Sequence, residues 1–222
     1  DRLLCSAARV NGHKMRNGTI TNEDRAKLVE KAGELANAPL YVDDSPTRTV
    51  SEIASAARRI QRTHNGHLGL IVIDYLQLIE PDNARDPRQE QVARIARRLK
   101  GLARDLKVPV LCLAQLNRQA EGSADHRPKL SHLRESGAIE QDADVVMFIH
   151  REEYYRRGED AEQFAGLAEI IIAKQRNGPV GEIEVLWQKD FTRFVDKAPE
   201  RLQAFDDFNS GAESGVAGGD PF

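Results

Sequence analysis

The sequence predicts an α/β domain with a mostly parallel sheet and flanking helices. Three continuous apolar segments of strand length, at residues 68–73, 110–114 and 144–149, alternate with segments of helical periodicity. Unbroken apolar runs are typical of strands buried on both faces. Residues 168–195 instead predict an antiparallel hairpin after these strands. Strands that alternate with helices in this way favour a layered α/β architecture.

The first third of the chain is expected to be mainly helical. Residues 1–38 have helical character, and Thr21-Asn22-Glu23-Asp24 has the composition of a helix N-terminus. Leu40-Tyr41-Val42 predicts a short strand. Residues 51–62 then place apolar side chains at helical spacing.

A long helix is expected before the second apolar segment. Its apolar residues recur at steps of three and four, at Val92, Ile95, Leu99, Leu102 and Leu106. Between Arg85 and Lys107 there are eight Lys and Arg against three Asp and Glu. The other face is therefore basic, and it is either a nucleic-acid contact or, more commonly for such helices, a solvated surface.

The C-terminal part predicts a hairpin and then a tail. Residues 170–172 lead through Asn177-Gly178-Pro179 into residues 182–185, which alternate polar and apolar side chains. From residue 205 onward Gly, Ser and Asp dominate without periodicity. We expect one folded but incomplete domain at residues 1–204 and a disordered acidic tail at 205–222.

Composition excludes several functional classes. The 222 residues carry 32 Lys and Arg against 35 Asp and Glu, which excludes a strongly basic coat but not a local basic patch. The longest apolar run, residues 68–73, is far shorter than the ~18 residues of a membrane span. Two cysteines are too few for a disulfide framework. We expect a cytoplasmic protein without a membrane partner.

The sequence lacks a phosphate-binding loop of the G-x-x-x-x-G-K-[ST] type. None of the 16 glycines is followed by lysine. In nucleotide-hydrolysing α/β proteins this loop holds the phosphates through its backbone N–H groups and its lysine. Its absence therefore conflicts with an ATPase as a complete enzyme.

Polar residues follow the predicted strands, where α/β sheets bind ligands. Asp74 ends the first apolar run and either organises the Mg²⁺ of Mg-ATP through water or caps the next turn. Gln115 follows the second run and either contacts a terminal phosphate or simply ends a strand. Lys174 and Arg176 share one face of the hairpin, so they suit an anion unless the tip is only solvated.

A polar segment with charges of both signs, residues 127–144, is expected to form a loop. Small residues at 136–138 would let backbone amides approach a phosphate closely. Taken alone, the segment could also be an ordinary surface loop.

Together, and in this order, these segments resemble the bacterial replicative DNA helicases of the DnaB family. Residues 70–78 are similar to the Walker B strand of that family, and residues 113–118 to its next helicase motif. Residues 133–144 and 170–179 resemble the two motifs that follow. The resemblance covers roughly residues 1 to 195.

The resemblance implies a RecA-like ATPase domain in a homohexameric ring around one DNA strand. It implies ATP and Mg²⁺ as cofactors, with Asp74 organising the metal through water and Gln115 sensing the γ-phosphate. Lys174 and Arg176 would reach the ATP of the neighbouring subunit. The implied activity is 5′-to-3′ unwinding at the replication fork, with a primase and a helicase loader as partners.

Further residues take roles by the same resemblance. Arg134, Glu135 and Gly137 would lie on a pore loop that grips the phosphates of single-stranded DNA. Arg2 matches a position near the nucleotide base.

The sequence departs from the family pattern at its start. In the family, the phosphate-binding loop and the glutamate that activates water both lie before the position that corresponds to Asp1. We therefore expect this chain to be a fragment without ATP turnover of its own. The strand that carries Gln115 would then have an open apolar edge.

Two other interpretations remain open. The chain could belong to another RecA-like ATPase, such as a recombinase. It could also be a module without ATPase activity that binds DNA or a helicase ring.

Overall fold

The computed structural model describes residues 1–117 and 126–197, which form two compact units. The first unit comprises residues 1–36, residues 165–168 and the described residues from 184 onward. The second comprises the described residues from 37 to 164 together with residues 169–183. The predicted domain end at residue 204, the predicted tail at 205–222 and Arg118 lie outside the described residues.

The first unit begins with three helices, as the sequence predicts. They are α1 (Arg2–Ala8), α2 (Gly12–Arg16) and α3 (Asn22–Ala36). Thr21 and Asp24 cap α3 reciprocally, because the N–H of each donates to the side-chain oxygen of the other at 3.1 Å. Ala8, Val10 and Leu28 form a small core beneath these helices.

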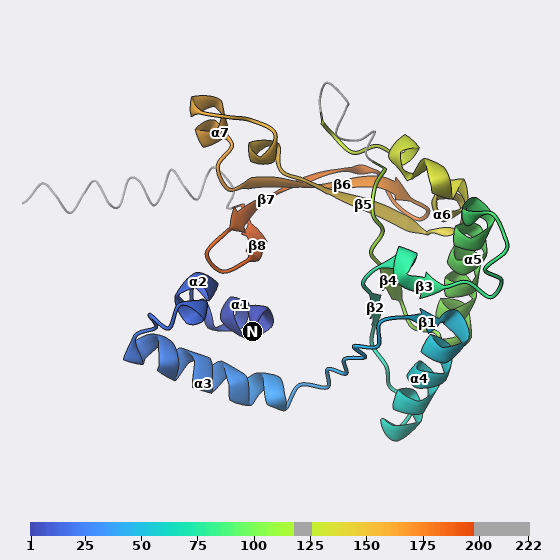
Figure 1. The fold of residues 1–222 in the computed structure, drawn as a ribbon, viewed down its shortest axis with the longest axis horizontal. Coiled ribbons are helices and arrows are strands. Elements are labelled where there is room, and N and C mark those ends of the chain that lie inside the picture. The colour runs from blue at the N-terminus through green and yellow to red at the C-terminus, as the bar shows by residue number, and fades with distance from the viewer. Residues whose placement is uncertain (118–125, 198–222) are drawn as a thin grey trace, which may run out of the picture. The chain divides into compact units, whose positions relative to one another are not determined.

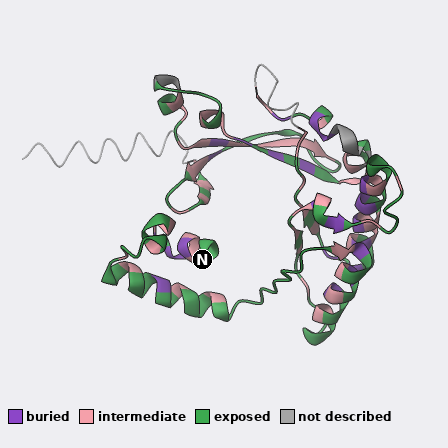
Figure 2. Ribbon diagram, in the orientation of Figure 1, coloured by how far each residue is buried: buried purple, intermediate pink, exposed green. Residues whose placement is uncertain are grey.

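Two helices carry the main core of the second unit (Figures 1 and 2). They are α4 (Val50–Thr63), which Thr49 and Glu52 cap, and α5 (Arg88–Leu106). All of the apolar α5 residues predicted to share a face are buried, at Val92, Ile95, Leu99, Leu102 and Leu106. The helical period read from the sequence is therefore confirmed, because that face packs against α4 and the neighbouring strands.

Parallel strands lie beside these helices in two short pairs. β1 (Arg48–Thr49) pairs with β3 (Ile79–Glu80), and β2 (Ile71–Ile73) pairs with β4 (Val110–Cys112). A 3₁₀ helix, η1 (Leu76–Leu78), connects β2 to β3. Sequence reasoning missed the β1–β3 pair, since two-residue strands have no detectable period.

The expectation that β2 and β4 are buried on both faces is wrong for this chain. Ile71, Ile73 and Cys112 pack against the core of α4 and α5. The alternate residues are exposed, with Val72 at 57% and Leu111 at 41%. In a strand, successive side chains point to opposite faces, and among the described residues only one face of this pair is covered.

A four-stranded antiparallel sheet completes the fold, in the order β5-β6-β7-β8. Its strands are β5 (Val145–His150), β6 (Leu167–Gln175), β7 (Gly181–Gln188) and β8 (Arg193–Asp196). The predicted hairpin corresponds to β6 and β7, so the antiparallel part extends further than expected. The α/β class with parallel strands, flanking helices and C-terminal antiparallel strands is confirmed.

Other local predictions need correction. Residues 40–42 form no strand, and their side chains are exposed. Along the chain, β1 is the first segment that pairs as a strand. β5 is not a strand buried on both faces, because Val146, Phe148 and His150 are buried while the alternate residues are exposed.

The segment expected to be a loop is largely helical. It contains the 3₁₀ helix η3 (Leu130–Ser136) and helix α6 (Gly137–Asp142). Leu133 is buried against Val146 and Phe148, and Ile139 packs against the core of α4 and α5. These apolar anchors order a segment whose polar composition suggested a loop. Two short elements, η4 (Glu152–Tyr154) and α7 (Glu159–Gln163), precede β6.

Among the described residues, no helix combines the length and the apolar character that crossing a membrane requires.

We predict that the Cys112 thiol resists alkylation in the folded protein. Burial raises the pKa of Cys112 to about 12, so its thiolate fraction at pH 8 is about a thousandfold below that of an ordinary cysteine. Iodoacetamide labelling followed by peptide mass spectrometry measures the rate at Cys112, and the same protein in guanidinium chloride is the control. Equal rates in the two conditions would contradict the placement of Cys112 against the core.

Candidate functional site

The parallel β2–β4 pair brings two predicted site residues to one sheet edge. Ile73 and Cys112 are partners at the end of the ladder, and Asp74 and Gln115 lie just beyond it on their respective segments. Both residues are exposed. Neither side chain makes a hydrogen bond or ion pair with any residue that the structure describes. The Asp74 carboxylate and the Gln115 amide are therefore available to a ligand.

The main chain of Gln115 is held by the side chain of Gln77. The Gln115 N–H donates to Gln77 Oε1 at 3.2 Å, and Gln77 Nε2 donates to the Gln115 carbonyl at 3.2 Å. Gln77 belongs to η1, which begins two residues after Asp74 along the chain. The segments that carry Asp74 and Gln115 are thus joined beyond the end of their ladder.

The predicted DNA-contact segment begins next to the Gln115 segment. The Asn117 N–H donates to the His132 carbonyl in η3 at 3.2 Å. Leu116 packs against the cluster that contains the buried Leu133. The main chain at Arg134 and Glu135 is part of η3, whereas their side chains lie outside the described residues. This backbone contact places the two segments side by side.

Gly137 is the first residue of α6 and is exposed. A Cβ added to Gly137 would meet no described atom within 4 Å. Its backbone is therefore open to a close approach, as the small residues of this segment suggested.

Lys174 and Arg176 converge on the last turn of α6. Lys174 Nζ donates to the carbonyl of Glu140 and, at 3.2 Å, to that of Gln141. Arg176 Nη2 donates to the same Gln141 carbonyl at 2.7 Å. The prediction that the two cations share one face is confirmed. The carbonyls of a helix C-terminus carry partial negative charge, which makes this position favourable for cations.

Asp144 connects this pair of cations to α5. Its carboxylate accepts a hydrogen bond from Lys100 Nζ and lies 3.6 Å from Arg176 Nε. The hydrogen bond from Lys100 lowers the pKa of Asp144, and the charges of Lys100, Arg176 and Lys174 lower it further. Asp144 therefore stays ionised at neutral pH and holds a positive cluster together.

The predicted residues fall into separate groups. Asp74 and Gln115 form one group, and Lys174 and Arg176 form another. No side-chain hydrogen bond or ion pair between described residues joins the two groups. Arg2 is exposed at the first position of α1 and belongs to the other compact unit, so its role stays a separate prediction.

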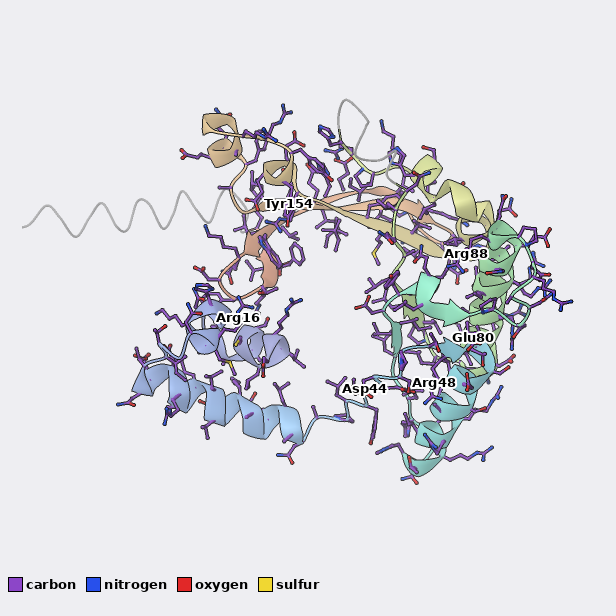
Figure 3. The ribbon with its side chains drawn as sticks, viewed as in Figure 1. Arg16, Asp44, Arg48, Glu80, Arg88 and Tyr154 are labelled. Carbon is purple, nitrogen blue, oxygen red and sulfur yellow. The ribbon has the colours of Figure 1, made fainter. Side chains whose placement is uncertain are left out.

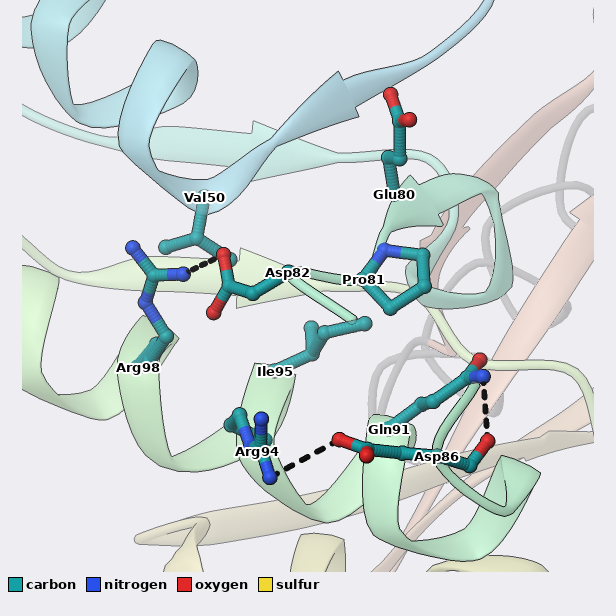
Figure 4. A pocket seen from close by; sticks show the side chains of 9 residues that line it. All are labelled: Val50, Glu80, Pro81, Asp82, Asp86, Gln91, Arg94, Ile95 and Arg98. Atoms are coloured by element: carbon teal, nitrogen blue, oxygen red, sulfur yellow. Dashed lines mark hydrogen bonds and ion pairs between the residues drawn. The ribbon is translucent and has the colours of Figure 1, made fainter. Parts of the chain in front are cut away.

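A pocket between α5 and the segment after β3 contains none of the predicted residues (Figure 4). Four of its charged groups form two ion pairs: Arg94 Nη2 lies 3.0 Å from Asp86, and Arg98 pairs with Asp82. Gln91 Nε2 donates to the Asp86 carbonyl at 2.7 Å. These contacts fix the segment after β3 to α5.

Nearby carboxylates pair with four of the eight Lys and Arg of residues 85–107. Besides the pairs in the pocket, Lys100 pairs with Asp144, and Arg97 lies 4.0 Å from Asp142. Each of these carboxylates offsets one positive charge, so the net charge of this face is smaller than the sequence count suggests. The structure therefore favours the solvated-surface interpretation of this face over a nucleic-acid contact.

Sequence reasoning missed three residues that organise the site. Gln77 lies within the segment similar to the Walker B strand, and Lys100 is one charge of a basic face. Asp144 lies where the polar segment meets a predicted strand, and the sequence pattern assigns a role to none of the three. The available signal for Gln77 was its position shortly after a strand-end carboxylate. The contacts of Lys100 and Asp144 connect distant segments and leave no local pattern.

The chain matches the family model described as DnaB-like helicase C terminal domain over residues 1–196. It is 46% identical over 196 residues to the replicative DNA helicase DnaB of Geobacillus stearothermophilus, covering 88% of this chain and 42% of that protein. It is 47% identical over 202 residues to the replicative DNA helicase DnaB of Pasteurella multocida, covering 90% and 42%. The chain thus spans about two fifths of the length of these relatives.

Two solved structures have a fold similar to that of this chain. One solved ATPase domain has a TM-score of 0.83 at 40% identity, with 89% of this chain and 69% of that chain covered. A DnaB-like replicative helicase, in a structure that describes its interactions with primase, also has a TM-score of 0.83, at 39% identity, with 89% and 47% covered. The chain therefore belongs to the DnaB-like helicase C-terminal domain family.

Proposed function

We propose that the complete gene product containing this chain is an ATP-dependent replicative DNA helicase that unwinds duplex DNA in the 5′-to-3′ direction. The observation that carries the proposal is the common sheet edge of Asp74 and Gln115, in a chain 45–47% identical to replicative DNA helicases. A carboxylate and an amide at the ends of adjacent parallel strands suit the metal and terminal phosphate of a nucleotide.

The described residues fit ATP and Mg²⁺ as cofactors. Mg²⁺ prefers oxygen ligands and keeps several waters, so one exposed carboxylate without a protein partner is a suitable anchor. When bound, Mg²⁺ neutralises phosphate charge. The Asp74 carboxylate would hold the metal's water shell, and the Gln115 amide would donate to a terminal phosphate oxygen. Arg2 would lie near the base.

Lys174 and Arg176 are proposed to act on the nucleotide of a neighbouring subunit in a homohexamer. Within this chain they are grouped with α6 rather than with Asp74 and Gln115. The α6 carbonyls and Asp144 use only some of their N–H donors, since a guanidinium has five and an ammonium three. The remaining donors stay available for phosphate oxygens.

Residues 134–137 are proposed to contact single-stranded DNA. Arg134 would pair with a phosphate, Glu135 would orient neighbouring groups, and the exposed Gly137 backbone would approach the strand. A primase and a helicase loader are the proposed protein partners. The similar DnaB-like helicase whose structure describes interactions with primase supports the first. The proposed location is the cytoplasm, at the replication fork.

The first prediction from this function concerns unwinding. The complete gene product with ATP and Mg²⁺ should unwind a forked duplex that has a 5′ tail, and Asp74→Asn should abolish unwinding because the metal anchor loses its charge. Asp105→Asn, an exposed carboxylate on α5, is the matched control and should retain wild-type activity. Strand exchange without unwinding would indicate a recombinase. Binding of DNA without ATP turnover would indicate a non-enzymatic module, and either result would overturn the proposal.

The second prediction concerns the cations on β6 and the turn that follows. Arg176→Ala should lower the ATPase kcat by about 10³–10⁵, the effect of removing an arginine finger. If the residue acts across subunits, rings mixed from Arg176→Ala and Asp74→Asn protein should regain ATPase activity, because some interfaces then combine an intact Asp74 of one subunit with an intact Arg176 of its neighbour. Mixed rings no more active than either variant alone would contradict action across subunits. Arg104→Ala, on the exposed side of α5, is the control.

The third prediction concerns DNA binding. Arg134→Ala should weaken single-strand binding and reduce the slope of log affinity against log salt by about 0.7, the contribution of one phosphate contact to single-stranded DNA. Fluorescence anisotropy with an oligonucleotide across a salt series measures the slope. An unchanged slope in Arg134→Ala would remove this residue from the DNA contact.

A further inference from the structure

The side chain of Gln77 continues the β2–β4 ladder after the β2 strand has ended. The regular part of the ladder includes a bond from the Ile71 N–H to the Pro109 carbonyl at 3.0 Å. Next, the Leu113 N–H donates to the Ile73 carbonyl at 2.9 Å, and the Leu76 N–H donates to the Leu113 carbonyl at 2.8 Å. Gln115 is the next residue of that segment to present its N–H and carbonyl to this side.

No strand backbone is present at that point, because the chain turns into η1 at Leu76. The Gln77 side-chain amide supplies both missing partners, with Oε1 accepting from the Gln115 N–H and Nε2 donating to the Gln115 carbonyl, each at 3.2 Å. A primary amide presents an acceptor and a donor in one plane, as a peptide group does. The side chain thus substitutes for one backbone unit of a strand.

Gln77 is itself held on both sides. Leu76 and Ile79, which flank it closely in sequence, are buried in the main core at 3% and 4% exposure. Arg88, at the start of α5 (Figure 3), donates from Nη2 to the Gln77 carbonyl at 3.1 Å. The main chain from which the Gln77 side chain reaches Gln115 is therefore fixed to the core and to α5.

We propose that Gln77 is a positioning residue, which fixes the main chain of Gln115 relative to Asp74. The proposal rests on the proposed roles of those two residues at the nucleotide. A group that detects a terminal phosphate must be held to within about 0.5 Å of its productive position. Gln115 is exposed three residues beyond the end of the short strand β4, and the Gln77 amide provides two hydrogen bonds that hold its main chain there.

The identity of the residue follows from the same geometry. Glutamate at position 77 would keep an acceptor for the Gln115 N–H but lose the donor, and its charge would face the Gln115 carbonyl. Asparagine is one methylene shorter and would not span the gap. Alanine removes both bonds.

The first experiment tests the two Gln77–Gln115 hydrogen bonds independently of activity, by amide hydrogen exchange at Gln115. Loss of one ordinary hydrogen bond should make exchange about two- to tenfold faster in Gln77→Ala. Gln77→Glu should stay closer to the wild type, because its carboxylate still accepts from the Gln115 N–H. Gln61→Ala is the matched control, since Gln61 is also partly buried and donates to a backbone carbonyl elsewhere, that of Leu106. Unchanged exchange in Gln77→Ala overturns the proposal.

The link to turnover is tested in the complete gene product with a double-mutant cycle. Gln77→Ala should lower kcat at least tenfold and leave the KM for ATP within about twofold. The variant Gln77→Ala/Gln115→Ala should be no slower than Gln115→Ala alone, because Gln77 acts through Gln115. Additive losses overturn the positioning role even if exchange accelerates. If the wild-type gene product hydrolyses no ATP, the proposed function fails, and hydrogen exchange still decides whether Gln77 holds Gln115.

Discussion

The candidate site depends on the parallel pairing of β2 with β4. Each strand has only three residues, yet their register decides that Asp74 and Gln115 emerge at the same edge. The ladder is anchored on one face by the core of α4 and α5 and is prolonged by the Gln77 side chain. Two residues proposed to bind one nucleotide from different segments must keep a fixed relative position, and the β2–β4 pairing provides it.

The segment that follows β4 is also connected to the proposed DNA-contact residues. Asn117, just beyond Gln115, donates to the His132 carbonyl, and Leu116 packs with Leu133. Two residues of main chain then lead from His132 to Arg134. The segment that carries Gln115 is therefore attached to η3 by a backbone hydrogen bond and an apolar contact.

α6 connects the DNA-contact segment to the cations on the other side. Gly137 begins this six-residue helix, and the carbonyls in its last turn receive Lys174 and Arg176. About one helical turn thus separates the proposed DNA contact from the position of both cations. Asp144, with its lowered pKa, and Lys100 attach this arrangement to α5. The proposed DNA-contact segment and the two cations are therefore attached to the same short helix.

Periodicity explains which parts of this structure the sequence could predict. The stepped apolar residues of α5 define a buried face without any knowledge of partners, and Asn177-Gly178-Pro179 marks the β6–β7 turn. Leu40-Tyr41-Val42 has strand composition but pairs with no other described segment, so it forms no strand. Strand formation requires a neighbour, which local composition does not specify.

The parts of the site that were missed share one physical cause. Gln77 contacts Gln115, 38 positions away, and Lys100 contacts Asp144, 44 positions away. Such hydrogen bonds depend on how distant segments meet. Strand-end positions could be predicted, because the alternation of strands and helices indicates where ligands bind. The side chains that hold those positions could not.

The central claim is tested most directly by a structure of the complete gene product with a non-hydrolysable ATP analogue, Mg²⁺ and a single-stranded oligonucleotide. The decisive quantity is the distance from the Gln115 side-chain amide to the nearest terminal phosphate oxygen. We predict a hydrogen bond of about 3 Å, with both Gln77–Gln115 bonds retained. A bound nucleotide whose terminal phosphate lies beyond hydrogen-bond reach of Gln115, or a Gln77 side chain turned away from it, would contradict the account.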